Sequence, residues 1–172
     1  MKLATLFNQA IKFGREHDPR GKGHFEYPDT RLLYGKPNTE VKKVMVGIDI
    51  EVAELLLADK IRQNGGLDLV ISHHPEGRAW ASLYEVMRLQ IDMLKKIGLP
   101  HSVAQALVEE RKREVERKVL PANHMRAVDA AKLLDMPFMC LHTVADNFAS
   151  FFIHRLLKDK NPKILKDIIG IL

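Results

Sequence analysis

Residues 41–72, VKKVMVGIDIEVAELLLADKIRQNGGLDLVIS, contain two apolar runs separated by a helical segment. The runs at residues 41–50 and 67–72 are rich in valine, isoleucine and leucine, which is typical of strands covered on both faces. Residues 51–63 carry apolar side chains at helical spacing and lead into an Asn-Gly-Gly sequence that suits a helix C-cap. Strand, helix and strand in this order predict a right-handed βαβ unit with parallel strands.

The remaining segments predict further helices and strands around this unit. A short strand is expected at residues 31–34 and a third apolar strand at residues 137–141. Apolar residues at helical spacing predict a first helix that begins near Leu3 and stops near Gly14. Further helices are expected over residues 83–97, 102–119, 123–135, 148–160 and 162–172. We therefore expect an α/β fold with a mainly parallel sheet flanked by helices.

The composition excludes several classes of protein. A length of 172 residues suits a single domain over residues 1–172. The net charge is +5, but acidic and basic residues are mixed along the chain, so the charge does not favour nucleic acid as a partner. Cys140 is the only cysteine, so no intrachain disulfide and no thiolate zinc site can form. The N-terminus lacks a signal-peptide core, and no apolar run approaches the roughly 20 residues of a membrane span. We therefore expect a cytoplasmic protein with no membrane partner.

Histidines follow two of the predicted strands. His73 and His74 come directly after the strand at residues 67–72, and His142 follows the third strand, four positions before Asp146. Ligands of parallel sheets collect at the carboxyl ends of the strands. The His73–His74 pair can spread its two rings where the strand ends, and a helical turn after His142 would put Asp146 on the same side of the chain.

These residue types suit a metal site. Mixed histidine and carboxylate ligation favours Zn, Fe or Mn over Mg or Ca, and a carboxylate such as Asp146 is a usual bridge between two metals. The alternative is that the histidines bond loop carbonyl groups while Asp146 caps the following helix. Glu76 could be a general base or a further ligand, or simply an exposed loop acid. A loop that holds His17, Asp18, His24 and Glu26 could form a second metal site, but a polar surface loop is the simpler interpretation.

Both histidine motifs resemble those of a known family. DLVISHHP at residues 68–75 and PFMCLHTVADN at residues 137–147 resemble the NGG-one-interacting factor three-like family, many members of which are identified as GTP cyclohydrolase one type two. PDTRLLYG at residues 28–35 and VKKVMVGIDIEVAELLLADKI at residues 41–61 are similar to further stretches of the family. The resemblance covers most of residues 1–160.

The resemblance implies a fold, a cofactor and an assembly. It implies an α/β fold, a dinuclear metal centre that could hold Zn, Fe or Mn, and a homo-oligomer that is often a ring-shaped hexamer. By resemblance, His73 and His74 are metal ligands, Asp146 is a bridging carboxylate, and His142 lines the site.

The chain departs from the family pattern in two places. The family completes its site with a C-terminal His-x-x-x-Glu, whereas His154 is followed four positions later by Lys158. We therefore expect a family-like fold that lacks part of its C-terminal region, either as an excerpt of a longer protein or as a short homologue. The gap between the two histidine motifs is also longer than usual, which predicts a helical insertion at about residues 102–135 that could bring His124 to the site.

Two functions remain open at this stage. The first is a metal-dependent hydrolase of the GTP cyclohydrolase type, in which His142 or Glu76 shuttles protons. Its substrate would be a small molecule, and the resemblance suggests a purine nucleotide. The second is a non-catalytic protein that binds or delivers the metal, or a protein-interaction module. The missing His-x-x-x-Glu would favour the second function in a complete chain.

Overall fold

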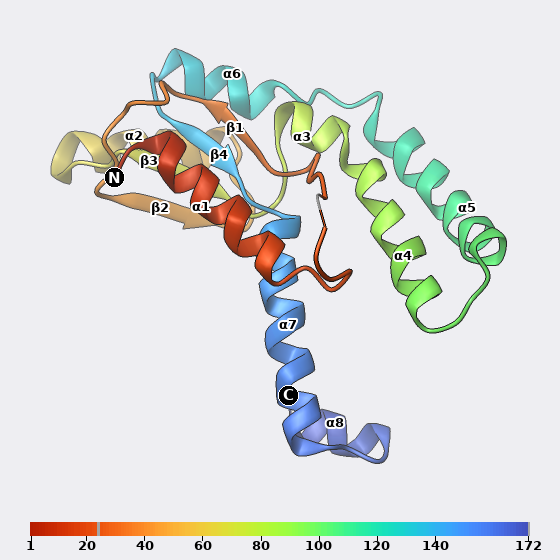
Figure 1. Cartoon of the computed structure of the whole chain (residues 1–172). Coiled ribbons are helices and arrows are strands. Elements are labelled where there is room, and N and C mark those ends of the chain that lie inside the picture. Colours follow the sequence, from red (N-terminus) through yellow and green to blue (C-terminus); the bar gives the residue numbers. More distant parts are fainter. Residues whose placement is uncertain (24, 172) are drawn as a thin grey trace.

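The computed structural model describes residues 1–23 and 25–171, and its centre is a four-stranded sheet flanked by helices (Figure 1). The strands are β1 (Arg31–Tyr34), β2 (Val44–Gly47), β3 (Leu69–Ser72) and β4 (Phe138–Cys140), in the order β1-β4-β3-β2. β2, β3 and β4 are parallel, and β1 runs antiparallel to β4. This arrangement confirms the predicted α/β fold with a mainly parallel sheet.

Helices cover both faces of the sheet. The described helices are α1 (Leu3–Glu16), α2 (Val52–Gly65), α3 (Gly77–Ala81), α4 (Arg88–Lys96), α5 (His101–Val119), α6 (Arg126–Leu133), α7 (Thr143–Lys160) and α8 (Leu165–Ile171), with a 3-10 turn, η1, at Leu83–Met87. One core cluster joins Val70 and Phe138 of the sheet to α2 and α6. A second cluster joins Leu69, Ile71 and Met139 to α1. Alternate residues of β3 thus face opposite helical layers, as the pleat of a buried strand requires.

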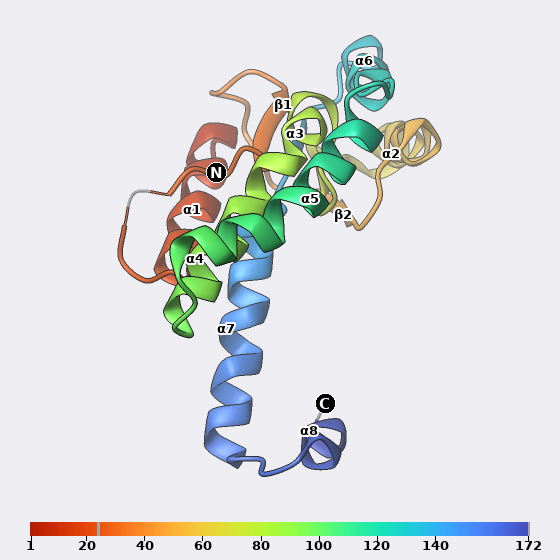
Figure 2. The same cartoon turned by 90° about the vertical axis from the view of Figure 1, so that its right-hand side faces the viewer.

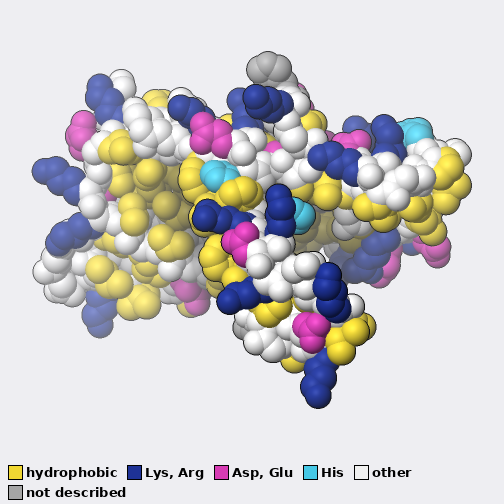
Figure 3. Space-filling model, turned by 60° about the horizontal axis from the view of Figure 1, so that its bottom comes forward, with side chains coloured by type: hydrophobic (Ala, Val, Ile, Leu, Met, Phe, Trp, Pro, Cys, Tyr) yellow, Lys and Arg dark blue, Asp and Glu magenta, His cyan; other side chains and the backbone are white. Residues whose placement is uncertain are grey.

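The strand predicted at residues 41–50 is shorter and more exposed to solvent than expected. Only residues 44–47 form β2, which lies at the edge of the sheet, and Val44 and Val46 are 44% and 67% exposed. The prediction that both of its faces are covered is therefore wrong. Figure 3 shows hydrophobic side chains gathered on the side where β2 forms the edge of the sheet. An apolar run has the same pattern in an edge strand and in a central one, so periodicity could not separate them.

Among the helix boundaries that differ from the prediction, two concern the contact between α1 and α7. Gly14 does not end α1, which continues to Glu16. A Cβ atom added at Gly14 would lie 2.7 Å from Cα of Val144, so glycine is required here for the approach of α7. α7 in turn begins at Thr143, five residues before the expected start of that helix. The first turn of α7 therefore packs against α1.

Within the segment between the two histidine motifs, η1, α4 and α5 form a group of helices that pack on one another. The helix predicted at residues 83–97 is divided into η1 and α4, and α5 packs beside α4 (Figure 2). On the other side, α7 projects away from the sheet and carries α8 at its far end, as both cartoon views show. In the described residues, no helix has the length and apolar character needed to cross a membrane.

Candidate metal centre

The carboxyl ends of β3 and β4 bring three histidines together. Ser72, the last residue of β3, pairs with Cys140, the last residue of β4, because the two strands are parallel neighbours. His73, His74 and His142 follow at this edge, and each offers a ring nitrogen that lies within 4.8 Å of those of the other two. The two motifs, 68 residues apart in the sequence, thus form one cluster.

Asp146 adds a carboxylate to this cluster. Since α7 begins at Thr143, Asp146 lies one turn after His142 and its backbone N–H donates to the His142 carbonyl oxygen at 3.0 Å. Its Oδ1 lies 3.5 Å from Nε2 of His73, and its Oδ2 lies 3.7 Å from Nε2 of His142. Asp146 lies in the first turn of α7 rather than at its N-cap, so the alternative in which it caps the helix does not hold.

A buried aspartate orients His142. Asp29 lies two positions before β1 and is fully buried. Its Oδ2 accepts a 2.6 Å hydrogen bond from Nδ1 of His142. The same oxygen accepts bonds from the backbone N–H and the hydroxyl of Thr143. Burial lowers the pKa of His142, but the hydrogen bond and the charge of Asp29 outweigh it, so that pKa is raised overall. Sequence reasoning gave Asp29 no role, although it lies in the PDTRLLYG stretch that carries part of the resemblance.

The other two histidines are oriented in the same way. Nδ1 of His74 lies 2.6 Å from Oδ1 of Asp49, and Nδ1 of His73 lies 3.4 Å from the carbonyl oxygen of Leu141. All three partners are acceptors, so a neutral ring that donates its Nδ1 proton to this partner keeps a lone pair on Nε2 for a metal. Metal-binding histidines have this arrangement, in which a carboxylate or carbonyl holds the nitrogen that does not bind the ion. The residues present therefore fit a divalent metal with nitrogen and oxygen ligands.

Glu76 is buried, which excludes the exposed loop acid considered above. The residue is 9% exposed and lies two positions after His74. Burial and, to a smaller extent, the charge of Glu51 raise its pKa to about 7 against the opposing charge of Arg126. A carboxyl group with this pKa can exchange a proton near neutral pH.

Other candidate residues lie apart from the cluster. Nε2 of His124 bonds the carbonyl oxygen of Val119 at 2.7 Å, and its ring meets Trp80 edge-on, so it is held by its own loop. Asp18 is buried, forms an ion pair with Arg20 and accepts a hydrogen bond from Tyr27, whereas we expected it to lie in a polar surface loop. His24 of that loop lies outside the described residues.

Cys140 is buried next to the site but has the properties of a core residue. Burial raises the pKa of its thiol to about 11, so the thiol stays protonated at neutral pH. A thiol in this state is neither a nucleophile nor a metal ligand.

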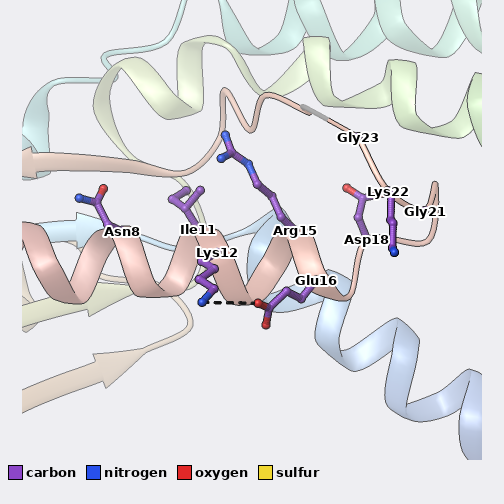
Figure 4. Close-up of a pocket in the computed structure, with 9 residues that line it drawn as sticks. All are labelled: Asn8, Ile11, Lys12, Arg15, Glu16, Asp18, Gly21, Lys22 and Gly23. Carbon is purple, nitrogen blue, oxygen red and sulfur yellow. Dashed lines mark ion pairs between the residues drawn. The ribbon is translucent and has the colours of Figure 1, made fainter.

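An open cavity of about 450 Å³ adjoins the cluster. His142 and Asp146 line one side of it, and residues of η1, α4 and α5 line the other. A second open cavity of about 650 Å³ lies along α1 and the loop after it, and shares no residue with the histidine cluster (Figure 4). Its lining includes an exposed ion pair between Lys12 and Glu16. The smaller cavity is therefore the one that could hold a molecule against the histidines.

Comparison with solved structures agrees with the fold. The chain is similar to a crystal structure of a NIF3 superfamily protein from Sphaerobacter thermophilus, with a TM-score of 0.77 and 26% sequence identity. The likeness covers 99% of this chain, which spans 60% of that protein. No family model and no curated protein matches the chain. The fold is thus NIF3-like, and the match supports the NIF3 superfamily, the family that the histidine motifs resemble.

Proposed function

We propose that the chain is a metal-dependent hydrolase whose divalent metal centre is built from His73, His74, His142 and Asp146. The observation that carries the proposal is the orientation of the three imidazoles, because each Nδ1 faces an acceptor and each Nε2 is left as a lone-pair donor. A surface cluster of histidines without a ligand has no need of such uniform orientation. The fourth donor, Asp146, lies against two of the three rings.

The four donors suit Zn, Fe or Mn. A divalent ion at this site supplies a Lewis acid that polarises the substrate and makes water a stronger acid at neutral pH. Asp29 and Asp49 keep their histidines in one tautomer and one orientation. Glu76, with its pKa of about 7, is the proposed proton carrier, because His142 is used here as a metal ligand. In the dinuclear form that the resemblance implies, Asp146 would bridge the two ions.

The proposed substrate is a small molecule, with a purine nucleotide as the first to test. The resemblance to cyclohydrolase-like members supports this choice, and the net charge of +5 is compatible with an anionic substrate. The cavity of about 450 Å³ is within the range of about 300–1,000 Å³ that is usual for small-molecule sites.

Metal analysis of the purified protein tests the site. We expect bound Zn, Fe or Mn in the wild type, and loss of most of it in a His73→Ala, His74→Ala double variant that remains folded. A His101→Ala, His154→Ala variant is the matched control, since both of these histidines are exposed and neither belongs to the cluster. Equal metal content in the wild type and the His73, His74 variant would refute the ligand assignment.

Turnover separates the hydrolase from the non-catalytic alternative. With metal bound, we expect metal-dependent release of formate from GTP, and we expect Glu76→Gln to lower the rate about 100-fold or more while it keeps the metal. Bound metal without turnover of any nucleotide tested would contradict the hydrolase and leave a metal-binding, metal-delivery or protein-interaction module.

We further propose that the chain forms a homo-oligomer, with the hexamer that the resemblance implies as the first form to test. The resemblance supports this proposal, and so do the exposed apolar side chains Val44, Val46 and Ile48 at the β2 edge. Sedimentation equilibrium of the purified protein would measure the assembly, and a monomer at micromolar concentration would contradict it.

A further inference from the structure

The cavity beside the proposed metal centre has two chemically different walls. One wall belongs to the first turns of α7 and contains His142 and Asp146. The opposite wall comes from η1, α4 and α5, the helices that separate the two histidine motifs in the sequence. That wall is largely apolar, with Val86, Met87 and Val115 among its residues. A ligand in the cavity would therefore lie between polar ligating groups and a hydrophobic surface.

A single cationic side chain lines this cavity among the described residues, and it belongs to Arg111 of α5. Its side chain is 62% exposed, and its Nη1 lies 2.5 Å from a carboxylate oxygen of Glu114, one helical turn away. A guanidinium group has five N–H donors in a planar fork, so it can keep this partner and still hold an anionic oxygen of a ligand. Gln90 of α4 offers an uncharged amide in the same cavity.

We propose that Arg111 is a specificity residue that holds the anionic end of the substrate, while the apolar wall holds the uncharged remainder of the molecule. The substrate class is then a small molecule with an apolar portion and a phosphate or carboxylate group, which extends from α5 to the histidine cluster. The inference rests on the proposed function, because the reacting end of the molecule is taken to lie at the metal centre. The inference gives η1, α4 and α5 a role in substrate recognition, because these helices form the wall opposite the metal centre.

Binding measured without metal tests this role separately from catalysis. The probes are adenosine 5′-monophosphate, adenosine-5′-carboxylic acid and uncharged adenosine, titrated calorimetrically in the presence of EDTA. We expect the wild type to bind the two anions about tenfold or more tightly than adenosine, as one charge-assisted contact allows. Arg111→Met should abolish the preference and leave adenosine binding and metal content unchanged.

Arg113→Met is the matched control. Arg113 is also on α5, its side chain is 65% exposed, and it pairs with Glu109 one turn away, but it does not line the cavity. This variant should keep the full preference for the anions. The proposal is overturned if Arg111→Met keeps the preference, if Arg113→Met loses it equally, or if the wild type binds neither anion at millimolar concentration. A preference confined to one anion would identify phosphate or carboxylate as the recognised group. Failure of the metal assay would not alter these readings, which are taken with the metal removed.

Discussion

Asp29 shows how much of the candidate centre depends on residues behind the ligands. A single carboxylate oxygen of Asp29, Oδ2, accepts hydrogen bonds from both His142 and Thr143, the residues at the start of α7. Since both partners are hydrogen-bond donors, the carboxylate aims Nε2 of His142 and anchors the helix that carries Asp146. A neutral amide of the same shape could accept from only some of these donors and would carry no charge.

Asp29→Asn should therefore weaken metal binding about 10- to 100-fold, the usual effect of losing a carboxylate behind a ligating histidine. Competition with a chromophoric chelator would measure the dissociation constant. Asp68→Asn is the control, because Asp68 is also a carboxylate that accepts backbone N–H groups, from Lys42 and Lys43, but it lies at the opposite end of β3. Equal metal affinity in the wild type and Asp29→Asn would show that Asp29 has only a structural role.

The environment of Tyr27 predicts that the stability of the protein depends on pH in the alkaline range. Its hydroxyl donates a 2.8 Å hydrogen bond to Oδ2 of Asp18, and burial together with that carboxylate raises its pKa to about 12. The unfolded chain loses this proton near pH 10, so the folded state binds more protons between pH 10 and 12. The stabilisation is complete below pH 10 and is lost as the pH rises through this window.

Urea unfolding at intervals from pH 9 to 12 would test this prediction. The free energy of unfolding of the wild type should fall by about 2 kcal/mol more than that of Tyr27→Phe over the window, because only the wild type titrates this phenol. Parallel curves for the two proteins would contradict the assignment.

The contact between α1 and α7 links the sheet to the candidate centre. Gly14 lies where the two helices approach most closely, and its carbonyl oxygen accepts a hydrogen bond from the Asn147 side chain. The same turns of α7 carry Asp146. The position of the carboxylate thus depends on a glycine in a different helix.

Gly14→Ala should destabilise the protein by about 1–3 kcal/mol, because the new methyl group meets Val144 and the helices must separate. Metal affinity should fall with it. Gly65→Ala is the control: Gly65 also lies in a helix, but an added Cβ there meets nothing within 4 Å, so stability should stay equal or rise by up to about 1 kcal/mol. Urea unfolding measures both, and equal effects of the two substitutions would contradict the packing argument.

The whole molecule combines a covered sheet with a helix that projects from it. α7 packs on α1 near its start, whereas Phe152 is 58% exposed farther along and Leu165 of α8 is 78% exposed. A segment with few buried apolar contacts opens locally at a low cost in free energy.

Backbone amides of α8 and of the last two turns of α7 should therefore exchange with solvent much faster than those of the first two turns of α7. Hydrogen exchange followed by mass spectrometry would measure the difference. Uniform protection along α7 would instead show that its projecting part is covered in solution, as self-association would require.

Local patterns were sufficient for much of the fold. The βαβ unit, the strand at residues 31–34 and the parallel sheet follow from apolar periodicity and from turn residues, which report on one segment at a time. The same reasoning predicted that HHP and HTVAD would meet, because the ends of neighbouring parallel strands share one edge of a sheet.

Other features depended on contacts between segments far apart in the chain. Asp29 lies 113 residues from His142 and reaches it only because β1 pairs with β4. The need for glycine at position 14 and the edge position of β2 likewise arise from neighbours that no local pattern identifies. Periodicity tells which face of an element is buried, but the partner that buries it, or leaves it exposed, is chosen when the whole chain packs.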